Sequence, residues 1–295
     1  TTFSTNIDAN ILAMAVQSDG RILVGGDFQS LQPSGDASPT YRRYLARLAS
    51  DGKVDASFNL DINEQPGNRV DSLRLLSDGR LLVGGVFSSL QPIGTATRVA
   101  RANFVRINAN GTLDEAFNPA PGGAPGGQVL ALAIQADNKV IAVGAFSELG
   151  GTKTTNIARF NPEGTADTSF GTTVTVSGPI NSVVVRPNSV TTASQLGGFA
   201  WLNRDGTPRA GFVASANARL SGEIYATLVL PDGSIILAGA FTNLTNATGG
   251  NMARFSAAGV LDTNFNPNPN GAVTGLVRDN EGRIVIVGSF TTVKG

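Results

Sequence analysis

The chain has 295 residues, of which 22 are basic and 22 acidic, so its formal net charge is zero. This balance excludes a general electrostatic attraction to nucleic acid or to an anionic membrane. The sequence contains no cysteine and no histidine, which excludes disulfides, thiol nucleophiles, histidine bases and the usual zinc ligands. No apolar run approaches the roughly 20 residues that a membrane-spanning helix needs, so we expect no membrane insertion.

One sequence plan recurs along nearly the whole chain. In residues 129–171, two apolar runs flank Asp137-Asn138 and two more flank Glu163-Gly164, which predicts two hairpins and therefore four short antiparallel strands. The second strands end in Gly-X-Phe at Phe28, Phe87, Phe146, Phe241 and Phe290, and the fourth strands end at Phe58, Phe117, Phe170, Phe212 and Phe265. One such unit cannot bury both of its faces, so the units must stack. We predict an all-β fold, a single β-propeller of about six four-stranded blades.

Taken in chain order, the predicted blades differ in completeness. The fourth blade is degenerate because Val190 to Phe199 leaves no room for a long loop, and the sixth is incomplete because the sequence reaches only its second strand. Residues 1–4 resemble the end of a fourth strand. We expect either that they close the sixth blade or that the chain is an excerpt from a longer array. If the chain is the whole subunit, the open blade could also take a strand from a neighbouring chain, and such strand exchange would allow self-assembly. The predicted blades cover residues 11–59, 70–118, 129–171, 180–212, 224–266, and 273–295 together with 1–4.

The connections within each unit are of two kinds. Tight turns such as Asp19-Gly20 and Asp51-Gly52 occur twice per unit, with glycine supplying a positive φ. Both turns lie on one face of a blade, so the longer connections must lie on the opposite face, which is where we expect a partner to bind. The candidate ligand-binding residues are Asp27, Tyr41, Tyr44, Asp61, Glu64, Asp71, Glu148 and Trp201. Trp201, the single tryptophan, is better explained as a core residue, although its place in the degenerate blade also allows it to stack on a sugar.

Third strands carry an arginine that is followed eight residues later by an aspartate. This spacing across a tight turn places the two side chains opposite or diagonal on adjacent strands. The pairs are Arg47 with Asp55, Arg106 with Asp114, Arg159 with Asp167, and Arg254 with Asp262. In the fourth unit, Trp201 and Arg209 replace both partners together. We interpret the pairs as structural ion pairs; four repeated binding sites for anions are the alternative.

The sequence offers weak signals for two kinds of chemistry, calcium binding and glycoside hydrolysis. Residues 108–114 faintly resemble a calcium loop, but they lack the bidentate glutamate that such a loop requires, and turn chemistry explains them better. Glycosidases use two carboxylates, and the predicted inner strands carry only Asp71 and Asp279. We therefore expect no catalytic residue, no cofactor and no metal.

The units resemble the bacterial delta-60 repeat family. The resemblance rests on residues 18–28 (SDGRILVGGDF), 45–48 (LARL) and 51–59 (DGKVDASFN), and it covers units one, two, three and five fully. It implies a β-propeller in large secreted or cell-surface bacterial proteins, and it transfers no catalytic residue. The function expected from it is a non-enzymatic extracellular or cell-surface module, an adhesin domain or a subunit of a surface assembly, that binds a protein or polysaccharide. The alternative is a carbohydrate-active enzyme or a calcium-dependent lectin with a site at the centre of the long-loop face.

Overall fold

The computed structural model describes residues 4–119, 127–171, 178–196, 198–209, 221–242 and 250–294. Strands, turns and loops make up these residues, and none of them is helical. The prediction of an all-β fold is therefore confirmed. No helix within these ranges could span a membrane. The chain forms two compact units, Thr1–Asp167 and Thr168–Gly295. Phe212 and residues 1–3, which the sequence assigned to the ends of fourth strands, lie outside the described residues.

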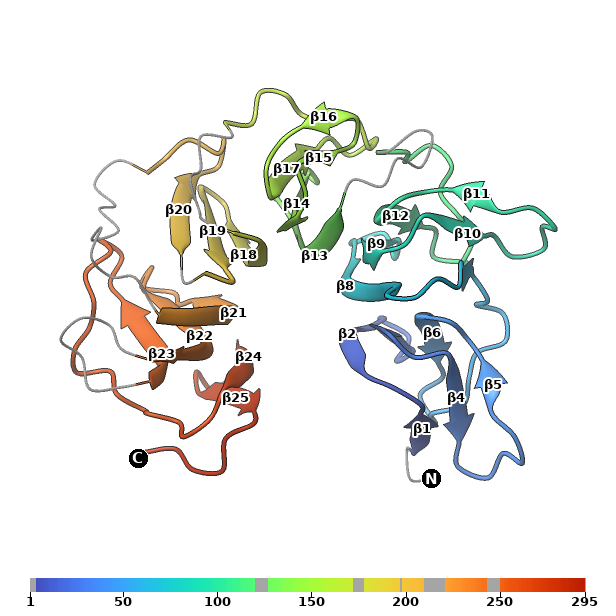
Figure 1. Ribbon diagram of the computed structural model, residues 1–295, viewed down its shortest axis with the longest axis horizontal. Coiled ribbons are helices and arrows are strands. Elements are labelled where there is room, and N and C mark those ends of the chain that lie inside the picture. Colours follow the sequence, from blue (N-terminus) through green and yellow to red (C-terminus); the bar gives the residue numbers. More distant parts are fainter. Residues whose placement is uncertain are drawn as a thin grey trace. The chain divides into compact units, whose positions relative to one another are not determined.

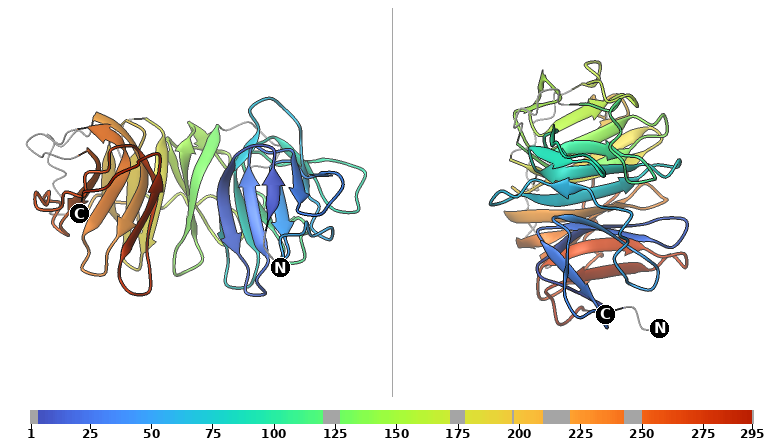
Figure 2. Two further views of the ribbon diagram at one scale, coloured as in Figure 1. Left: turned by 90° about the horizontal axis from the view of Figure 1, so that it is seen from below. Right: turned by 90° about the vertical axis from the view of Figure 1, so that its right-hand side faces the viewer.

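Unit one contains the first three predicted repeats. Each forms a three-stranded antiparallel sheet whose second strand lies between the first and the third (Figure 1). The sheets are β2 (Ile11–Val16), β3 (Ile22–Gly26) and β6 (Leu45–Leu48); β8 (Arg69–Leu75), β9 (Leu81–Val86) and β12 (Phe104–Ile107); and β13 (Gln128–Ile134), β14 (Val140–Ala145) and β17 (Ile157–Phe160). Turns between first and second strands lie at one end of these sheets (Figure 2, left).

Unit two repeats this plan with less decoration. The fourth repeat has three strands, the last two joined by a short turn, and the sixth has two strands among the described residues. The strands are β18 (Ile180–Arg186), β19 (Ser189–Ser194) and β20 (Phe199–Asn203); β21 (Ser221–Val229), β22 (Ile235–Thr242) and β23 (Gly250–Phe255); and β24 (Val273–Arg278) and β25 (Ile284–Gly288). The number of blades in a closed ring stays a prediction.

The predicted fourth strand is wrong in detail. After each third strand the chain makes one isolated antiparallel bridge, for example Leu48 with Val54, and then leaves the sheet. The reason is the aspartate that follows the bridge. Asp55 Oδ1 accepts a hydrogen bond from Ser57 N at 2.9 Å, and the Asp55 carbonyl accepts one from Phe58 N at 3.2 Å. This local turn competes with strand pairing.

Every first strand contains a β-bulge, and the glycine of each Gly-X-Phe motif lies opposite it. The register shifts by one residue between Val70 and Ser72, and the same shift occurs in all the other first strands of the repeats. Opposite the bulge, a Cβ added to Gly85 would lie 2.1 Å from the Arg69 carbonyl oxygen. Gly26, Gly144, Gly239 and Gly288 show similarly close backbone approaches. In these five repeats the partner backbone occupies the space of a side chain, whereas Ser194 stands at the same place opposite the bulge of the fourth repeat.

The long connections of unit one form small additional sheets. β4 (Ser30–Pro33) pairs with β5 (Thr40–Tyr41), β10 (Ser89–Gln91) with β11 (Val99–Ala100), and β15 (Glu148–Leu149) with β16 (Thr152–Lys153). The segment before each of the first two repeats adds a third strand, β1 (Thr5–Ile7) or β7 (Asp61–Ile62). The described part of the N-terminal segment therefore pairs within the first repeat.

Neighbouring repeats of one unit pack through their first and second strands. Val70 and Leu73 of β8 lie against β3, where a Cβ added to Gly25 would lie 2.5 Å from Val70 Cγ1. Ser72 Oγ accepts a hydrogen bond from Leu132 N at 3.2 Å, which links β8 to β13. In unit two, one cluster joins the fourth and fifth repeats and another joins the fifth and sixth. The core therefore consists of apolar layers between sheets, as stacking of the repeats predicted.

Candidate ligand-binding site

The four predicted ion pairs are all present. The Nε–Oδ2 distances are 2.9 Å for Arg47–Asp55, 2.7 Å for Arg106–Asp114, 2.9 Å for Arg159–Asp167 and 2.7 Å for Arg254–Asp262. The first three pairs are nearly buried, whereas the Arg254 side chain is 37% exposed.

These arginines also connect one repeat to the next. Arg47 Nη1 donates to the carbonyl of Ala109 at 3.2 Å, and the equivalent Arg106 Nη1 donates to the carbonyl of Pro162. The Arg106 guanidinium also lies 4.3 Å from the centre of the Phe117 ring, a favourable cation–π geometry. The guanidinium groups of Arg47 and Arg106 are thus used by their own repeat and by its neighbour, which supports the structural interpretation of these pairs.

Most of the aspartates contact a second cation from the first hairpin of their repeat. Arg80 Nη1 lies 3.2 Å from Asp114 Oδ2, and Lys139 Nζ lies 2.6 Å from Asp167 Oδ2. Burial alone would raise the pKa of Asp114, but the hydrogen bond and charge of Arg106, followed by those of Arg80, lower it below the ordinary aspartate value. The same balance, with Ser57 and Arg47 as the partners, lowers the pKa of Asp55.

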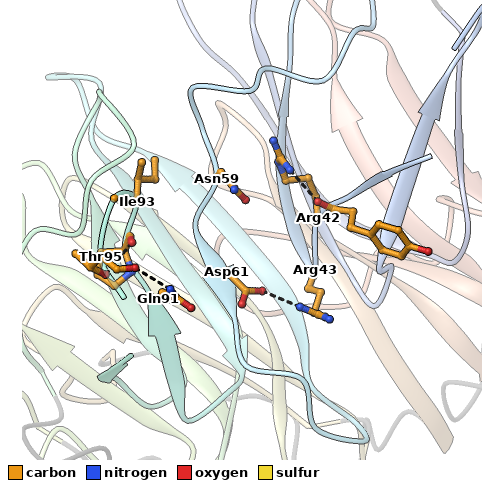
Figure 3. A pocket seen from close by; sticks show the side chains of 10 residues that line it. Arg42, Arg43, Asn59, Asp61, Gln91, Ile93 and Thr95 are labelled. Carbon is orange, nitrogen blue, oxygen red and sulfur yellow. Dashed lines mark hydrogen bonds and ion pairs between the residues drawn. The ribbon is translucent and has the colours of Figure 1, made fainter. Parts of the chain in front are cut away.

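A first surface pocket lies between the long connections of the first and second repeats. It has a volume of about 360 Å³ and is called the Arg42 pocket here; its lining is Tyr41, Arg42, Arg43, Asn59, Asp61 and residues 91–95. Figure 3 shows Arg42 and Arg43 on one side, with Gln91, Ile93 and Thr95 across from them. Asp61 is bound by Arg43 at 3.3 Å and by Arg98, so its charge is neutralised. The Tyr41 side chain is 71% exposed.

A second pocket adjoins the first through Arg43. The Tyr44 pocket has a volume of about 440 Å³ and is lined by Ala9, Asp27, Gln29, Tyr44 and residues 64–69. Arg43 Nη2 lies 2.9 Å from Glu64 Oε2, so this arginine bridges acids of both pockets. Asp27 accepts hydrogen bonds from Asn10 N at 2.7 Å and Asn10 Nδ2 at 2.9 Å.

A third and larger cavity, of about 660 Å³, lies among the tight turns of the first two repeats. Its lining includes residues 16–19, Arg21, residues 75–79 and Ala109. Arg21 is paired with Asp19 at 3.2 Å, and Ala109 accepts the Arg47 bond described above. The charged groups of this cavity therefore have structural partners, and its size alone does not favour it as a binding site.

The repeat pattern matches a known protein family. The family described as "Domain of unknown function (DUF5122) beta-propeller" matches residues 17–58, 76–117, 135–170 and 230–265, which together make up more than half of the chain. The chain belongs to this β-propeller family. The matched segments correspond to the first, second, third and fifth repeats and end at the phenylalanine of the predicted fourth strand. The finer resemblance to delta-60 repeats stays a prediction.

Two solved structures resemble this propeller chain over most of its length. A protein of unknown function from Bacteroides caccae covers 85% of this chain and 81% of its own, with 15% identity and a TM-score of 0.48. The match to the WD40 beta propeller domain of Doa1 covers 96% of this chain and 92% of that domain, with 12% identity and a TM-score of 0.46. At these scores neither similarity carries an argument. Comparison with curated proteins found no significant match.

In this member of the propeller family, five of the eight candidate ligand-binding residues line the two adjoining pockets. Tyr41 and Asp61 line the Arg42 pocket, whereas Asp27, Tyr44 and Glu64 line the Tyr44 pocket. Tyr44 requires a correction, because its side chain is only 3% exposed and belongs to an apolar cluster. Burial, followed by the Glu64 charge, raises the pKa of its hydroxyl. Tyr44 therefore forms a pocket wall and is not an exposed ligand platform.

The other three candidates lie apart from these pockets. Asp71 is the extra residue of the β8 bulge and is held by Arg69 and by Gln128 Nε2, each at 2.9 Å. Glu148 is exposed on β15. Trp201 is buried in unit two, and the guanidinium of Arg209 lies 4.4 Å from its ring centre. In the fourth repeat a cation–π contact thus replaces the ion pair, and the core interpretation of Trp201 agrees with its position.

The segment that resembled a calcium loop is used for turn formation. Asn110 Oδ1 accepts hydrogen bonds from Thr112 N at 3.0 Å and Thr112 Oγ1 at 2.8 Å. Within the described ranges, no three Asp, Glu, His or Cys side chains gather in a way that could hold a metal ion.

Sequence reasoning missed Arg42 and Arg43. Their signal is weak because both lie in a loop whose length differs between repeats. The equal spacing of the first two units does align Arg42 with Arg101, and this repeated arginine was the available clue.

Proposed function

We propose that the chain is a non-enzymatic binding module that recognises a partner at the long-connection surface of unit one. The observation that carries this proposal is the convergence of five sequence-predicted residues on two adjoining pockets joined by Arg43. Segments from three separate connections form this surface, whereas the sheets beneath them provide a packed support. Binding residues commonly lie on loops held by such a rigid scaffold.

The state of the pocket carboxylates supports binding over acid–base catalysis. Asp61 and Glu64 are both paired with Arg43, and Asp27 accepts two hydrogen bonds from Asn10. A catalytic carboxyl must be within hydrogen-bond reach of the group whose proton it transfers, whereas these three already contact protein groups. These carboxylates are arranged to shape the surface.

The partner that we propose is a protein or polysaccharide, and the site of action is outside the cell or on a bacterial surface. The resemblance to delta-60 repeats supports this location. The proposal is tested by measuring the affinity of the intact chain for polysaccharides and proteins extracted from bacterial surfaces, using biolayer interferometry. Tyr41→Ala should weaken the binding about tenfold, as expected for an exposed aromatic anchor. Val260→Ala removes a similarly exposed apolar side chain in unit two and should have no effect. Equal affinities of all three proteins would contradict the proposal.

A carbohydrate-active enzyme is the second candidate for this surface, because Asp27 and Glu64 line one pocket. Retaining and inverting glycosidases both need two carboxylates flanking the scissile bond. Release of reducing sugar from a polysaccharide by the intact chain, abolished in Glu64→Gln, would establish this candidate over the non-enzymatic one. A calcium-dependent lectin would instead lose its binding in the presence of a chelator.

Self-assembly is a further role that one observation favours. Met14 on β2 is 63% exposed, whereas the equivalent Leu73 and Leu132 are buried against the preceding repeat. In unit two, Val285 and Val287 of β25 are also exposed, on the side of the sheet that faces the following repeat elsewhere. Each of these faces exposes apolar residues at positions that other repeats of its own unit bury against a neighbour.

We propose that a second copy of the chain covers these faces in a head-to-tail contact, which would form rings or filaments. Light scattering over a range of protein concentrations tests this, with Met14→Glu expected to lower the mean mass. A monomer at every concentration would exclude a second copy as the occupant.

A further inference from the structure

Arg42 differs from most arginines of unit one in its charge environment. Eight arginines of this unit have a carboxylate oxygen within 4.0 Å: Arg21, Arg43, Arg47, Arg69, Arg80, Arg98, Arg106 and Arg159. Among the described residues of unit one, Arg42, Arg74 and Arg101 have no such partner. Of these three, Arg42 lines one of the pockets described above.

The guanidinium of Arg42 keeps unused hydrogen-bond donors. Nη1 donates to the Tyr41 carbonyl at 2.8 Å, and the buried Nε has no hydrogen-bond partner within the described part of the chain. Burial lowers the pKa of Arg42, and the charge of Asp55 opposes this effect. An arginine has five N–H donors in a planar fork that fits a carboxylate. The structure therefore leaves a partly desolvated positive charge at the pocket wall with no carboxylate oxygen within 4.0 Å among the described residues.

Arg101 shows which of these features belong to the repeat and which belong to the pocket. It occupies the equivalent position in the second repeat, its Nη1 donates to the Ala100 carbonyl at 2.9 Å, and its Nε is also buried without a partner. The contact to the preceding carbonyl is thus a shared structural feature. The exposed Tyr41 beside Arg42 has Ala100 as its counterpart. Only the first repeat therefore has an aromatic residue next to this arginine, and both residues line the Arg42 pocket.

The remaining lining of the Arg42 pocket fits a ligand rich in hydroxyl groups. Asn59 and Gln91 provide amides, and the charge of Asp61 is already neutralised by Arg43 and Arg98. The volume of about 360 Å³ lies near the lower end of the range for small-molecule sites. The Tyr41 ring presents an apolar face with a polar tip, which suits the face of a sugar ring.

We propose that the Arg42 pocket binds the carboxylate of an acidic sugar, a uronate unit of a polysaccharide. Arg42 donates to the carboxylate, the Tyr41 ring packs against the sugar, and the amides of Asn59 and Gln91 bind its hydroxyl groups. A recessed pocket favours a single sugar unit over the broad contact of a folded acidic protein. This inference rests on the proposed binding role of the surface and specifies its ligand.

The test is calorimetric titration of the intact chain with trimers of galacturonate, glucuronate and mannuronate, and with neutral galactose and glucose trimers. At least one uronate trimer should bind, and the neutral trimers should bind at least about tenfold more weakly, because they lack the charge-assisted bonds. Arg42→Gln should weaken uronate binding at least about tenfold, whereas the matched control Arg101→Gln should leave it unchanged. Tyr41→Ala, which alters an exposed side chain, provides a second variant if Arg42→Gln fails to fold.

Several outcomes would overturn this inference. Failure of all three uronates to bind would do so, as would equal losses in the Arg42 and Arg101 variants, since the effect would then be one of general charge. Stronger binding of a poly-glutamate peptide would assign the pocket to an acidic protein. Equal affinity for neutral trimers would also reject carboxylate recognition, yet the proposed binding role would survive. The proposed binding role of the surface has its own test, and it would be rejected if Tyr41→Ala left binding to surface extracts unchanged.

Discussion

Arg106 Nε donates to Asp114 Oδ2 at 2.7 Å, and both side chains are nearly buried. A charge left behind after removal of its partner from such a pair is costly. Arg106→Ala should therefore destabilise the protein by about 3 kcal/mol, measured by urea unfolding. Arg254→Ala is the matched control, because the equivalent arginine is more exposed and its removal should cost clearly less. Similar losses for both variants would show that burial does not set the effect.

The lowered pKa values of Asp55 and Asp114 make stability depend on acidity. A carboxyl with a lowered pKa in the folded state binds protons more readily when unfolded, so stability rises with pH in that window. The contribution of these aspartates to the free energy of unfolding is complete above the ordinary aspartate pKa of about 3.9 and is lost as the pH falls below that value. The melting temperature should therefore drop below about pH 4. Asp114→Asn should melt lower at pH 7 and show a smaller further drop in acid; an identical acid profile would contradict the assignment.

Repetition within the chain made much of the fold predictable. The columns of glycine and phenylalanine mark the second strands, and the joint loss of arginine and aspartate in the fourth repeat indicated the ion pairs before their geometry was known. The predicted fourth strands were too long. Only one residue, Val54 in the first repeat, pairs with the third strand, and Asp55 then forms a turn. Strand propensity alone does not register this competition.

The candidate site was less predictable because it depends on loop conformation. Tyr44 looked like an exposed aromatic residue of a long connection, but its left-handed backbone, with φ of 64°, accompanies a side chain buried in the core. Arg42 became notable only when the partners of the surrounding arginines were known. Comparison of sequence columns identifies shared structural roles more readily than a residue that one repeat uses differently.

Tyr44 offers a direct test of how backbone strain and packing compete. Asn103, Asn156 and Asn251 occupy its position in other repeats with φ near 60°, and Asn103 Oδ1 accepts a bond from Phe87 N at 3.1 Å. Tyr44→Asn should relieve strain of about 1–2 kcal/mol. It also removes a buried ring, whose loss costs about 3–5 kcal/mol. The net result should be destabilisation by about 2 kcal/mol in urea unfolding. A more stable variant would mean that the ring contributes little to the core.

Gly85 should tolerate a side chain poorly, because its partner strand approaches closely at the bulge of this repeat, although Ser194 stands opposite the equivalent bulge of the fourth repeat. A Cβ at this position would lie 2.1 Å from the Arg69 carbonyl oxygen and 3.0 Å from Val70 Cα, both of them backbone atoms. A flexible side chain could rotate away, but here the paired strand itself must shift. Gly85→Ala should therefore destabilise the protein by about 3 kcal/mol, the upper part of the usual range for overpacking. In Gly171→Ala the nearest atoms lie at 3.4 Å, an ordinary contact, so urea unfolding of this control should show a change within about 0.5 kcal/mol. Equal stability of the two variants would show that the bulge adjusts freely, and the recurrence of glycine would then require another cause.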